Sequence, residues 1–435
     1  MRNQDVLYWI WLAEKCGPAS KYFNSLMEIY DNPFDIYLLE NDEVEQLKKL
    51  SKTLRDKLCE KDLERAYEIL KFCKQERIDI ITYADMRYPE RLKNLQDPPV
   101  LLYCKGHFPD VNSRLCIGIV GTRKMSEYGK QSAYKIAYEL GSADVLTVSG
   151  MALGVDGVSA CGALAAGGDT VAVLGCGLDT VYPKQHERLM EEIVRHGAVI
   201  SEYAPKEPPH SYNFPKRNRI ISGLCQGVLI VEAAVGSGAL ITAKDAIAQG
   251  REVFAIPGKI SDPGAEGPNE LIKGGAYTAL SADDILKHYE LIYGEDYNKD
   301  KMARAKRKGV NADRALEKYG LSYGISNYRE EMPEERIFEV KRARSKARVP
   351  DEEPQESASK SESVTTSAVS VDSALVEGLD PITRKIYDCL PPDKAVSADV
   401  CLVDGLTASD VITSLTLLEI SGMVASLPGG MYIRK

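Results

Sequence analysis

The stretch Leu115-Cys-Ile-Gly-Ile-Val120 is followed at once by Gly121-Thr-Arg-Lys124. A short apolar run rich in β-branched residues and closed by a glycine is typical of a buried strand that ends in a loop. Similar runs follow along the chain, with helical stretches between them, at residues 145–148, 170–174, 198–201, 228–231 and 252–256. Nearly continuous apolar strands that alternate with helices predict an α/β fold, with a mostly parallel sheet covered by helices on both faces.

The composition bounds the number of domains and the character of the surface. The chain has 435 residues, of which 44% are hydrophobic, and its formal net charge is −9. That length suggests roughly two to four domains and is ample for a large core. The acidic balance argues against a protein that is basic over its whole surface. It leaves room for a local basic groove, because binding follows the local field.

The cysteines and the first apolar run indicate the compartment. The ten cysteines are scattered, with no Cys-x-x-Cys pair and no Cys/His spacing typical of a zinc site. Reduced thiols in a cytosol fit this usage best. The apolar run 6–13 is too short to span a bilayer and lacks the cleavage site of a signal peptide. We therefore expect a cytoplasmic protein with no membrane partner and a core helix near residue 10.

Changes of pattern divide the chain into four expected parts. Residues 1–77 carry apolar positions at helical spacing and predict a helical domain like the SAM or helix-hairpin-helix folds. A packing role is favoured over a DNA clamp, because Gly17 is the only glycine there for a hairpin. Residues 78–288 hold the strand–helix alternation. Residues 289–376 are rich in charge and then in Ser and Thr, which predicts a flexible linker. Residues 377–435 predict three helices and a β-hairpin, the pattern of a winged helix.

The expected recognition helix of that winged helix is poorly suited to reading DNA sequence. Residues 407–422 contain Asp410 and Glu419 and no Lys or Arg. Base readout and phosphate contacts usually enlist cationic side chains. We therefore expect this part of the chain to contact a protein.

The loops after the first two strands of the α/β part carry residues that suit anions. In such sheets ligands bind at the carboxyl ends of the strands. The first loop contains Arg123, and the second begins with Ser149 and Gly150. Glycine lets the backbone approach a phosphate closely, and Arg can grip it with two hydrogen bonds. Glycines also end strands without binding anything, which is the simpler interpretation of any single loop. Several such loops on one edge favour an anion site.

The stretch 212–221, Tyr-Asn-Phe-Pro-Lys-Arg-Asn-Arg-Ile-Ile, crowds three cations at an expected helix start, namely Lys216, Arg217 and Arg219. Cations there oppose the helix dipole, and a bound anion would remove that conflict. Phe214 and Asn218 lie among the cations, an arrangement that suits a stacked base with bound phosphates. A solvated basic turn ahead of two buried isoleucines is equally compatible with this stretch alone.

The motifs of common nucleotide enzymes are missing from the sequence. No Gly-x-x-x-x-Gly-Lys-Ser/Thr loop occurs, and the glycine loops at 175–177 and 236–238 lack the third glycine of a dinucleotide fingerprint. The five histidines show no triad order, and no set of metal ligands is visible. We therefore expect a protein that is not an enzyme, with no catalytic residue, no metal and no cofactor.

With these motifs assembled, the chain resembles the DNA-processing family called DprA or Smf. The motifs that carry the resemblance occur in order across residues 82–288, at 119–123, 128–129, 149–156, 175–183, 214–221, 231–243, 255–258 and 267–276.

The resemblance implies an extended Rossmann-like domain that needs no cofactor. It implies a protein that binds single-stranded DNA, forms a homodimer, protects incoming DNA and helps load the RecA recombinase during natural transformation and recombination. Carried over by position, the residues that line the DNA pocket would be Arg123, Phe214, Arg217, Asn218 and Arg219, with Ser149, Gly150 and Lys216 nearby.

Two other functions remain open from the residues alone. Related folds cleave or sense small nucleotides, and a pair such as Glu232 and Arg217 could act on a glycosidic bond. Such an enzyme would bind and turn over mononucleotides, whereas a DNA binder would need a strand of several nucleotides. A winged-helix regulator with the large domain as its sensor is a weaker alternative.

Overall fold

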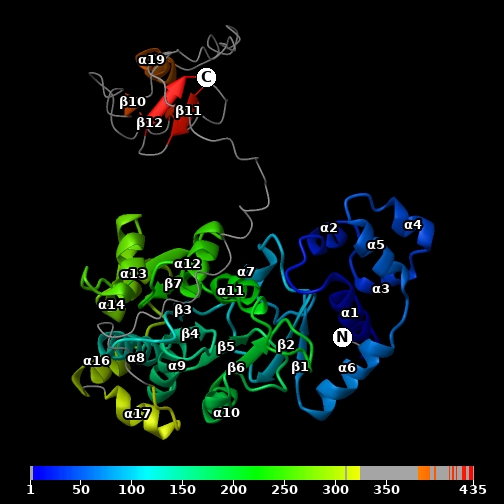
Figure 1. Cartoon of the computed structure of the whole chain (residues 1–435), viewed down its shortest axis with the longest axis horizontal. Coiled ribbons are helices and arrows are strands. Elements are labelled where there is room, and N and C mark those ends of the chain that lie inside the picture. The colour runs from blue at the N-terminus through cyan, green and yellow to red at the C-terminus, as the bar shows by residue number, and fades with distance from the viewer. Residues whose placement is uncertain are drawn as a thin grey trace, which may run out of the picture. The chain divides into compact units, whose positions relative to one another are not determined.

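The computed structural model describes residues 3–308, 311–323, 381–391, 396–397, 411, 414–415, 418, 424–427 and 431–434. The chain divides into two compact units, residues Met1–Glu335 and Arg336–Lys435. Figure 1 labels their helices and strands.

The first unit begins with six helices that pack into one core. They are α1 (Asn3–Cys16), α2 (Phe23–Met27), α3 (Pro33–Leu38), α4 (Asn41–Gln46), α5 (Lys52–Cys59) and α6 (Glu64–Gln75). Polar side chains fix two helix starts, because Asn32 caps α3 and Ser51 caps α5 through their side-chain oxygens. The apolar run near residue 10 lies inside α1, where Trp9 and Trp11 are buried. The expected core helix is therefore confirmed, and Figure 1 shows these helices beside β1 and β2.

A nine-stranded sheet forms the centre of this unit, in the order β1-β2-β6-β5-β4-β3-β7-β8-β9. Its strands are β1 (Asp79–Thr82), β2 (Leu101–Gly106), β3 (Cys116–Val120), β4 (Leu146–Ser149), β5 (Thr170–Leu174), β6 (Ala198–Ser201), β7 (Gly227–Ile230), β8 (Glu252–Ala255) and β9 (Tyr277–Thr278). The strands from β6 to β9 run parallel, and β2 and β1 continue the sheet in antiparallel pairing. The mostly parallel sheet predicted from the apolar runs is confirmed.

The order of the strands places a switch point at β3. The chain adds β4, β5 and β6 on one side of β3 and then returns to add β7, β8 and β9 on the other side. Crevices at the carboxyl ends of strands next to such a switch are the usual ligand sites of these folds. The loop after β3, which contains Arg123, lies at this point.

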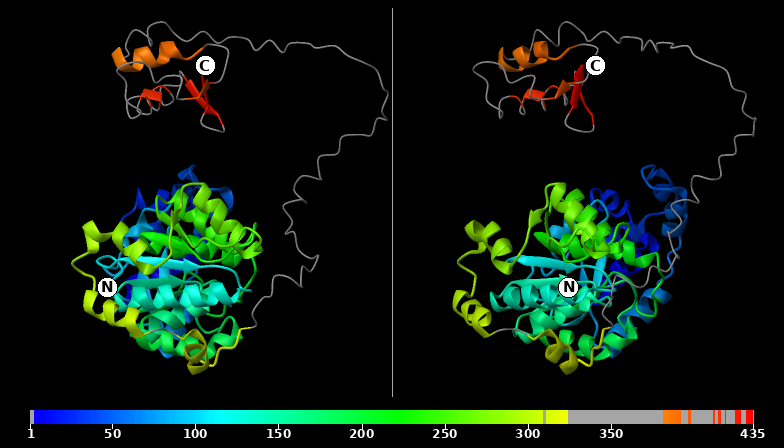
Figure 2. Two further views of the ribbon diagram at one scale, coloured as in Figure 1. Left: turned by 90° about the vertical axis from the view of Figure 1, so that its left-hand side faces the viewer. Right: turned by 60° about the vertical axis from the view of Figure 1, so that its left-hand side comes forward.

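Helices cover both faces of the sheet, as Figures 1 and 2 show. One face packs against α8 (Glu127–Ser142), α9 (Val155–Ala165) and α10 (Glu187–His196), and the other against α11 (Asn213–Leu224) and α12 (Gly238–Ala248). Successive residues of β3 enter opposite cores, because Ile119 packs on the first face and Val120 on the second. This unit also contains α7 (Glu90–Lys93), a 3-10 turn (Lys184–His186), α13 (Pro263–Lys273) and α14 (Ala282–His288).

The segment that follows α14 differs from the prediction of a linker at residues 289–376. It forms α15 (Glu290–Tyr293), α16 (Lys299–Lys308) and α17 (Ala312–Lys318). The side chains of Met302, Leu316 and Tyr319 are buried in the core of the first unit. These apolar side chains recur at helical spacing among many charges, so the charged composition concealed a packed segment. Residues 324–376 lie outside the described part of the chain.

The second unit is described in part. Helix α19 (Pro381–Cys389) agrees with the helix expected there, and β11 (Val424–Leu427) and β12 (Met431–Arg434) form the expected hairpin. β10 (Val396–Ser397) pairs with β12 to complete a three-stranded sheet. Ile386, Leu415 and Leu418 are buried in one small core. The sequence also predicts a short helix at 397–403, whereas Ser397 belongs to β10; residues 398–403 and most of the helix predicted at 407–422 lie outside the described residues.

Within the described ranges, none of the helices combines the length and the apolar character needed to cross a membrane.

Candidate nucleic-acid interface

The loops after β3, β4 and β5 meet the first turn of α11 around a small cavity. Its volume is about 40 Å³, and its lining residues are Arg123, Gly150, Ala152, Leu153, Tyr182, Pro183, Phe214 and Arg217. Four of these residues, Arg123, Gly150, Phe214 and Arg217, were predicted as site residues from the sequence. The carboxyl edge of the sheet therefore brings the predicted loops together.

Two aromatic rings and two guanidinium groups form the wall of this cavity. The rings of Tyr182 and Phe214 stack with centroids 5.2 Å apart and planes inclined by 30°. The guanidinium carbons of Arg123 and Arg217 lie 5.8 Å and 5.9 Å from the centroid of the Phe214 ring. Arg123 is exposed and Phe214 is half-buried. An accessible ring beside an exposed cation can hold a base by stacking and its phosphate by charge.

Arg217 is 4% exposed, and the protein itself uses much of its hydrogen-bonding capacity. Its Nη1 donates to the carbonyl oxygen of Gly150 at 3.0 Å and also to that of Val173. Burial lowers the pKa of Arg217 to about 10, and the nearby Asp156 carboxylate opposes that shift. The guanidinium therefore stays charged at neutral pH. Through these two hydrogen bonds Arg217 connects the loop after β4 to the end of β5, and its side chain also lines the cavity.

Asn218 and Ser149 are buried beside Arg217 and hold backbone in place. The Asn218 Oδ1 accepts a hydrogen bond from Arg217 Nε at 3.2 Å, and its Nδ2 donates to the carbonyl of Gly238 at 3.2 Å. The Ser149 hydroxyl accepts from the backbone N–H of Met151 at 3.3 Å. The contacts of Asn218 connect α11 to the start of α12, and the Ser149 hydroxyl holds the loop after β4, so both residues support the elements that surround the cavity.

The side chains of the three cationic residues of α11 lie in three different environments. Arg219 is buried and forms ion pairs with Glu202 at 2.5 Å and with Asp97 at 3.3 Å. Lys216 is exposed, and its Nζ lies 5.9 Å from the centroid of the Tyr212 ring. Only Arg217 lines the cavity beside Phe214. The basic cluster seen in the sequence is thus separated by the rotation of the helix.

The pair considered for a nucleotide-cleaving enzyme has other partners. The Glu232 carboxylate accepts hydrogen bonds from the backbone N–H of Ser126 at 2.9 Å and from the Ser126 hydroxyl, at the start of α8. Arg217 donates to carbonyl oxygens instead. Each residue is therefore engaged in holding backbone, and the geometry gives the enzyme alternative no support.

Buried His186 also holds a loop. Its Nδ1 lies 3.0 Å from the carbonyl oxygen of Met151, and its Nε2 lies 2.6 Å from the Tyr323 hydroxyl. Burial lowers the pKa of His186 to about 4, so the ring is neutral at physiological pH. Among the described residues, no group of His, Cys, Asp and Glu side chains could hold a metal ion.

Four lining residues were not predicted from the sequence, namely Ala152, Leu153, Tyr182 and Pro183, and Tyr182 is the aromatic one among them. It lies in the stretch 175–183, which carries part of the family resemblance, but its role was not assigned. The signal was an aromatic residue next to a proline in a loop that follows a buried strand.

Comparisons with known proteins give consistent matches. Residues 79–290 match the family described as DNA recombination-mediator protein A. The DNA processing protein DprA of Bacillus subtilis is 40% identical over 219 residues, which are 50% of this chain and 74% of that protein. Protein Smf of Escherichia coli is 44% identical over 204 residues, 47% of this chain and 54% of that protein. The X-ray structure of DprA from Streptococcus pneumoniae covers 65% of this chain and 97% of that chain, with 35% identity and a TM-score of 0.58.

The protein is an α/β protein with a mostly parallel nine-stranded sheet, N-terminal helices and a cavity at the carboxyl edge of that sheet. The chain belongs to the DNA recombination-mediator protein A family, whose relatives are called DprA and Smf. The resemblance predicted from the sequence motifs is therefore confirmed. The family is one of DNA recombination mediators, a non-enzymatic role that agrees with the expectation of a protein that is not an enzyme.

Proposed function

We propose that the protein binds single-stranded DNA at the cavity between Arg123, Tyr182 and Phe214. The observation that carries this proposal is the stacked aromatic pair beneath an exposed guanidinium at the carboxyl edge of the sheet. Every base has a flat aromatic face, so stacking tolerates any sequence, and cations beside the rings attract the backbone.

We assign different roles to the predicted site residues. Arg123, Phe214 and Lys216 would touch the strand, because their side chains are exposed or half-buried. Ser149, Gly150, Arg217 and Asn218 would shape the cavity, with Arg217 also presenting charge to it. Arg219 would support the fold through its ion pairs.

Family membership supports a wider role in the cell. We propose that this protein protects incoming single strands and helps load the RecA recombinase during natural transformation and recombination. We also propose that it acts in the cytoplasm as a homodimer. Both statements extend the resemblance in the sequence motifs and the match to the mediator family.

We retain the four-part division as a proposal, with residues 1–77 as a helical domain and 78–288 as the DNA-binding domain. The packing of α15, α16 and α17 moves the proposed start of the linker from residue 289 to beyond 323. For residues 377–435 we propose a winged helix, which the described helix, the three strands and their shared core support.

The function is tested by measuring affinity against oligonucleotide length and salt. Affinity should climb with length and then level off, because stacking energy accumulates along a strand. Each phosphate neutralised on a single strand contributes about −0.7 to the slope of log K against log salt. Arg123→Ala and Lys216→Ala should therefore each weaken binding and flatten the slope by about 0.7.

Lys49→Ala is a matched control for these variants, because that side chain is 72% exposed and lies in the N-terminal helical domain. It should leave the slope unchanged. If both site variants fold and keep the wild-type slope, the strand binds elsewhere. Tight binding and turnover of a mononucleotide would contradict the proposal and restore the enzyme alternative.

Deletion of residues 379–435 should change single-strand affinity by no more than a few-fold. The segment expected to enter a groove, residues 407–422, has two carboxylates and no Lys or Arg to meet phosphates. Fluorescence anisotropy with the full-length and shortened chains measures the difference. A large loss of affinity in a folded shortened chain would assign DNA contacts to the second unit.

A further inference from the structure

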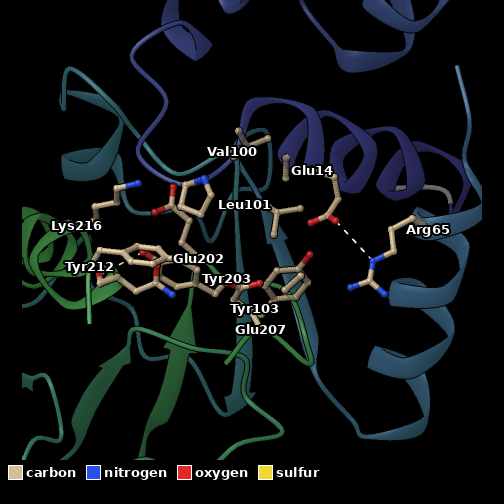
Figure 3. A pocket seen from close by; sticks show the side chains of 15 residues that line it. Glu14, Arg65, Val100, Leu101, Tyr103, Glu202, Tyr203, Glu207, Tyr212 and Lys216 are labelled. Atoms are coloured by element: carbon tan, nitrogen blue, oxygen red, sulfur yellow. Dashed lines mark hydrogen bonds and ion pairs between the residues drawn. The ribbon is translucent and has the colours of Figure 1, made fainter. Parts of the chain in front are cut away.

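A second cavity lies on the other side of the first turn of α11, between the N-terminal helices and the sheet (Figure 3). Its volume is about 270 Å³. Asn213 and Lys216 of α11, with Tyr212 just before it, line this cavity, whereas Phe214 and Arg217 line the first one. Consecutive residues of one helical turn thus serve two cavities, and we refer to the larger one as the domain-junction cavity.

Two buried polar groups in the domain-junction cavity lack a hydrogen-bond partner within the described part of the chain. Tyr103 is 1% exposed and Asn213 is 2% exposed. The Tyr103 hydroxyl and the Asn213 Nδ2 make no hydrogen bond. By contrast, the buried hydroxyl of nearby Tyr203 donates to the carbonyl of Asn213 at 3.2 Å. Native proteins rarely leave buried polar atoms unpaired, so a polar group bound in this cavity would satisfy them.

The charges that line this cavity leave one anion and one cation unpaired. Glu14 pairs with Arg65 at 3.7 Å, as Figure 3 shows, and Glu202 pairs with Arg219. No ion pair within the described ranges engages the lining residues Glu207 and Lys216. A ligand that complements this cavity therefore donates hydrogen bonds to the Glu207 carboxylate and places a negative charge beside the Lys216 ammonium group.

A nucleotide of the bound strand has this combination of groups. A guanine base presents two adjacent N–H donors and a carbonyl acceptor on one edge, and its phosphate carries the negative charge. Thymine presents only one N–H donor on that edge. The cavity lies below the range of roughly 300–1,000 Å³ typical of drug-sized ligands, so it suits one nucleotide and not a longer piece.

We propose that the domain-junction cavity binds one guanine nucleotide of the same single strand, with the base edge on Glu207 and Tyr103 and the phosphate on Lys216. This inference rests on the proposed single-strand binding at Phe214. Residues of one helical turn are separated by about 1.5 Å of rise each, so a strand that stacks on Phe214 passes close to Lys216. The N-terminal helices would then form one wall of this nucleotide site, through Ala13, Glu14 and Arg65.

The test compares thymine oligonucleotides that differ at one central position, which holds thymine, guanine, hypoxanthine or 7-deazaguanine. Hypoxanthine lacks the amino group that guanine offers to Glu207, whereas 7-deazaguanine keeps that whole edge. The strands with guanine and 7-deazaguanine should bind about fivefold or more tightly than the all-thymine strand, the expected size for a bidentate contact. The strand with hypoxanthine should lose most of that gain.

Glu207→Gln and Tyr103→Phe should each remove the preference for guanine while leaving affinity for the all-thymine strand unchanged. Glu191→Gln on α10, which removes the same charge from a side chain that is 62% exposed, is the matched control. Equal binding of all four strands by the wild-type protein would overturn the inference, and so would a guanine preference that survives both cavity variants. Failure of the proposed function is distinguishable, because Arg123→Ala and Lys216→Ala would then leave the salt slope of the all-thymine strand unchanged.

Discussion

Phe214→Ala should weaken single-strand binding by about 1–3 kcal/mol, the usual value of one base stacked on an aromatic side chain. Phe214 stacks on Tyr182 and lies beneath Arg123, so its ring is the centre of the proposed platform. Removing the ring also leaves Tyr182 without its stacking partner. The expected result is a loss of roughly five- to 150-fold in affinity, measured by anisotropy with an oligonucleotide of fixed length.

Two further variants separate stacking from general damage. Phe214→Tyr keeps an aromatic face and should retain most of the affinity, because stacking depends on the π-face. Tyr67→Ala removes an exposed ring from the N-terminal helical domain and should have no effect. If Phe214→Ala folds and binds as tightly as the wild-type protein, the base does not stack at this ring.

The sheet could be predicted from the sequence because both of its faces are buried. Strands such as β5, whose every residue is buried, leave a nearly continuous apolar run that is easy to recognise. The loops that hold Arg123, Ser149 and Gly150 could then be placed at one edge, since the carboxyl ends of parallel strands share an edge. That reasoning needed only the order of strands and helices.

The directions of the α11 side chains could not be predicted in the same way. Successive helical residues are rotated by about 100°, so neighbours in sequence face different surroundings. The partners of Arg219 come from residues 97 and 202, far away in the sequence. Nothing in a cationic stretch shows which of its charges is neutralised by a distant carboxylate.

Two other features could not be predicted because the sequence pattern around them is weak. They are Tyr182 and the packed segment at residues 299–323. Tyr182 lies in an irregular loop, where no periodic pattern indicates which side chains meet. In the later segment, apolar Met302 and Leu316 stand among many charges, and average composition suggested a linker. Spacing of the few apolar residues at helical intervals was the better signal there.

Arg219→Ala should destabilise the fold by about 3–5 kcal/mol, because removing one partner of a buried ion pair leaves the other charge buried and unpaired. Among the described residues, Glu202 would then keep the hydrogen bond that the backbone N–H of Ala19 donates to its Oε1 at 3.2 Å. The measurement is chemical denaturation of the wild-type and variant chains. Arg195→Ala is the control, because that exposed pair with Glu192 contributes about 0–1 kcal/mol.

A double variant identifies the cause of the loss. Arg219→Met combined with Glu202→Met removes both charges, and apolar replacement of a buried pair is often neutral. It should therefore recover much of the stability that Arg219→Ala loses. For Arg219→Ala, the salt dependence of single-strand binding should keep its wild-type slope, because the Arg219 guanidinium is paired with Glu202 and Asp97. A stable variant with a flatter salt slope would instead place Arg219 against DNA phosphates.

The loss in Arg219→Ala should also depend on pH. Burial raises the pKa of the Glu202 carboxyl, and the Arg219 guanidinium opposes that rise. Without Arg219 the pKa in the folded state rises further above its value in the unfolded chain. A carboxyl whose pKa is higher in the folded chain than in the unfolded chain binds its proton more tightly when folded. Its contribution to stability is therefore fully present below the unfolded pKa and is lost as the pH rises through the folded pKa. The difference in the free energy of unfolding between the wild type and Arg219→Ala should thus be smallest in mildly acidic solution, where Glu202 is protonated. It should be largest near neutral pH. A difference independent of pH would show that the lost stability comes from packing of the arginine side chain and not from the charge of Glu202.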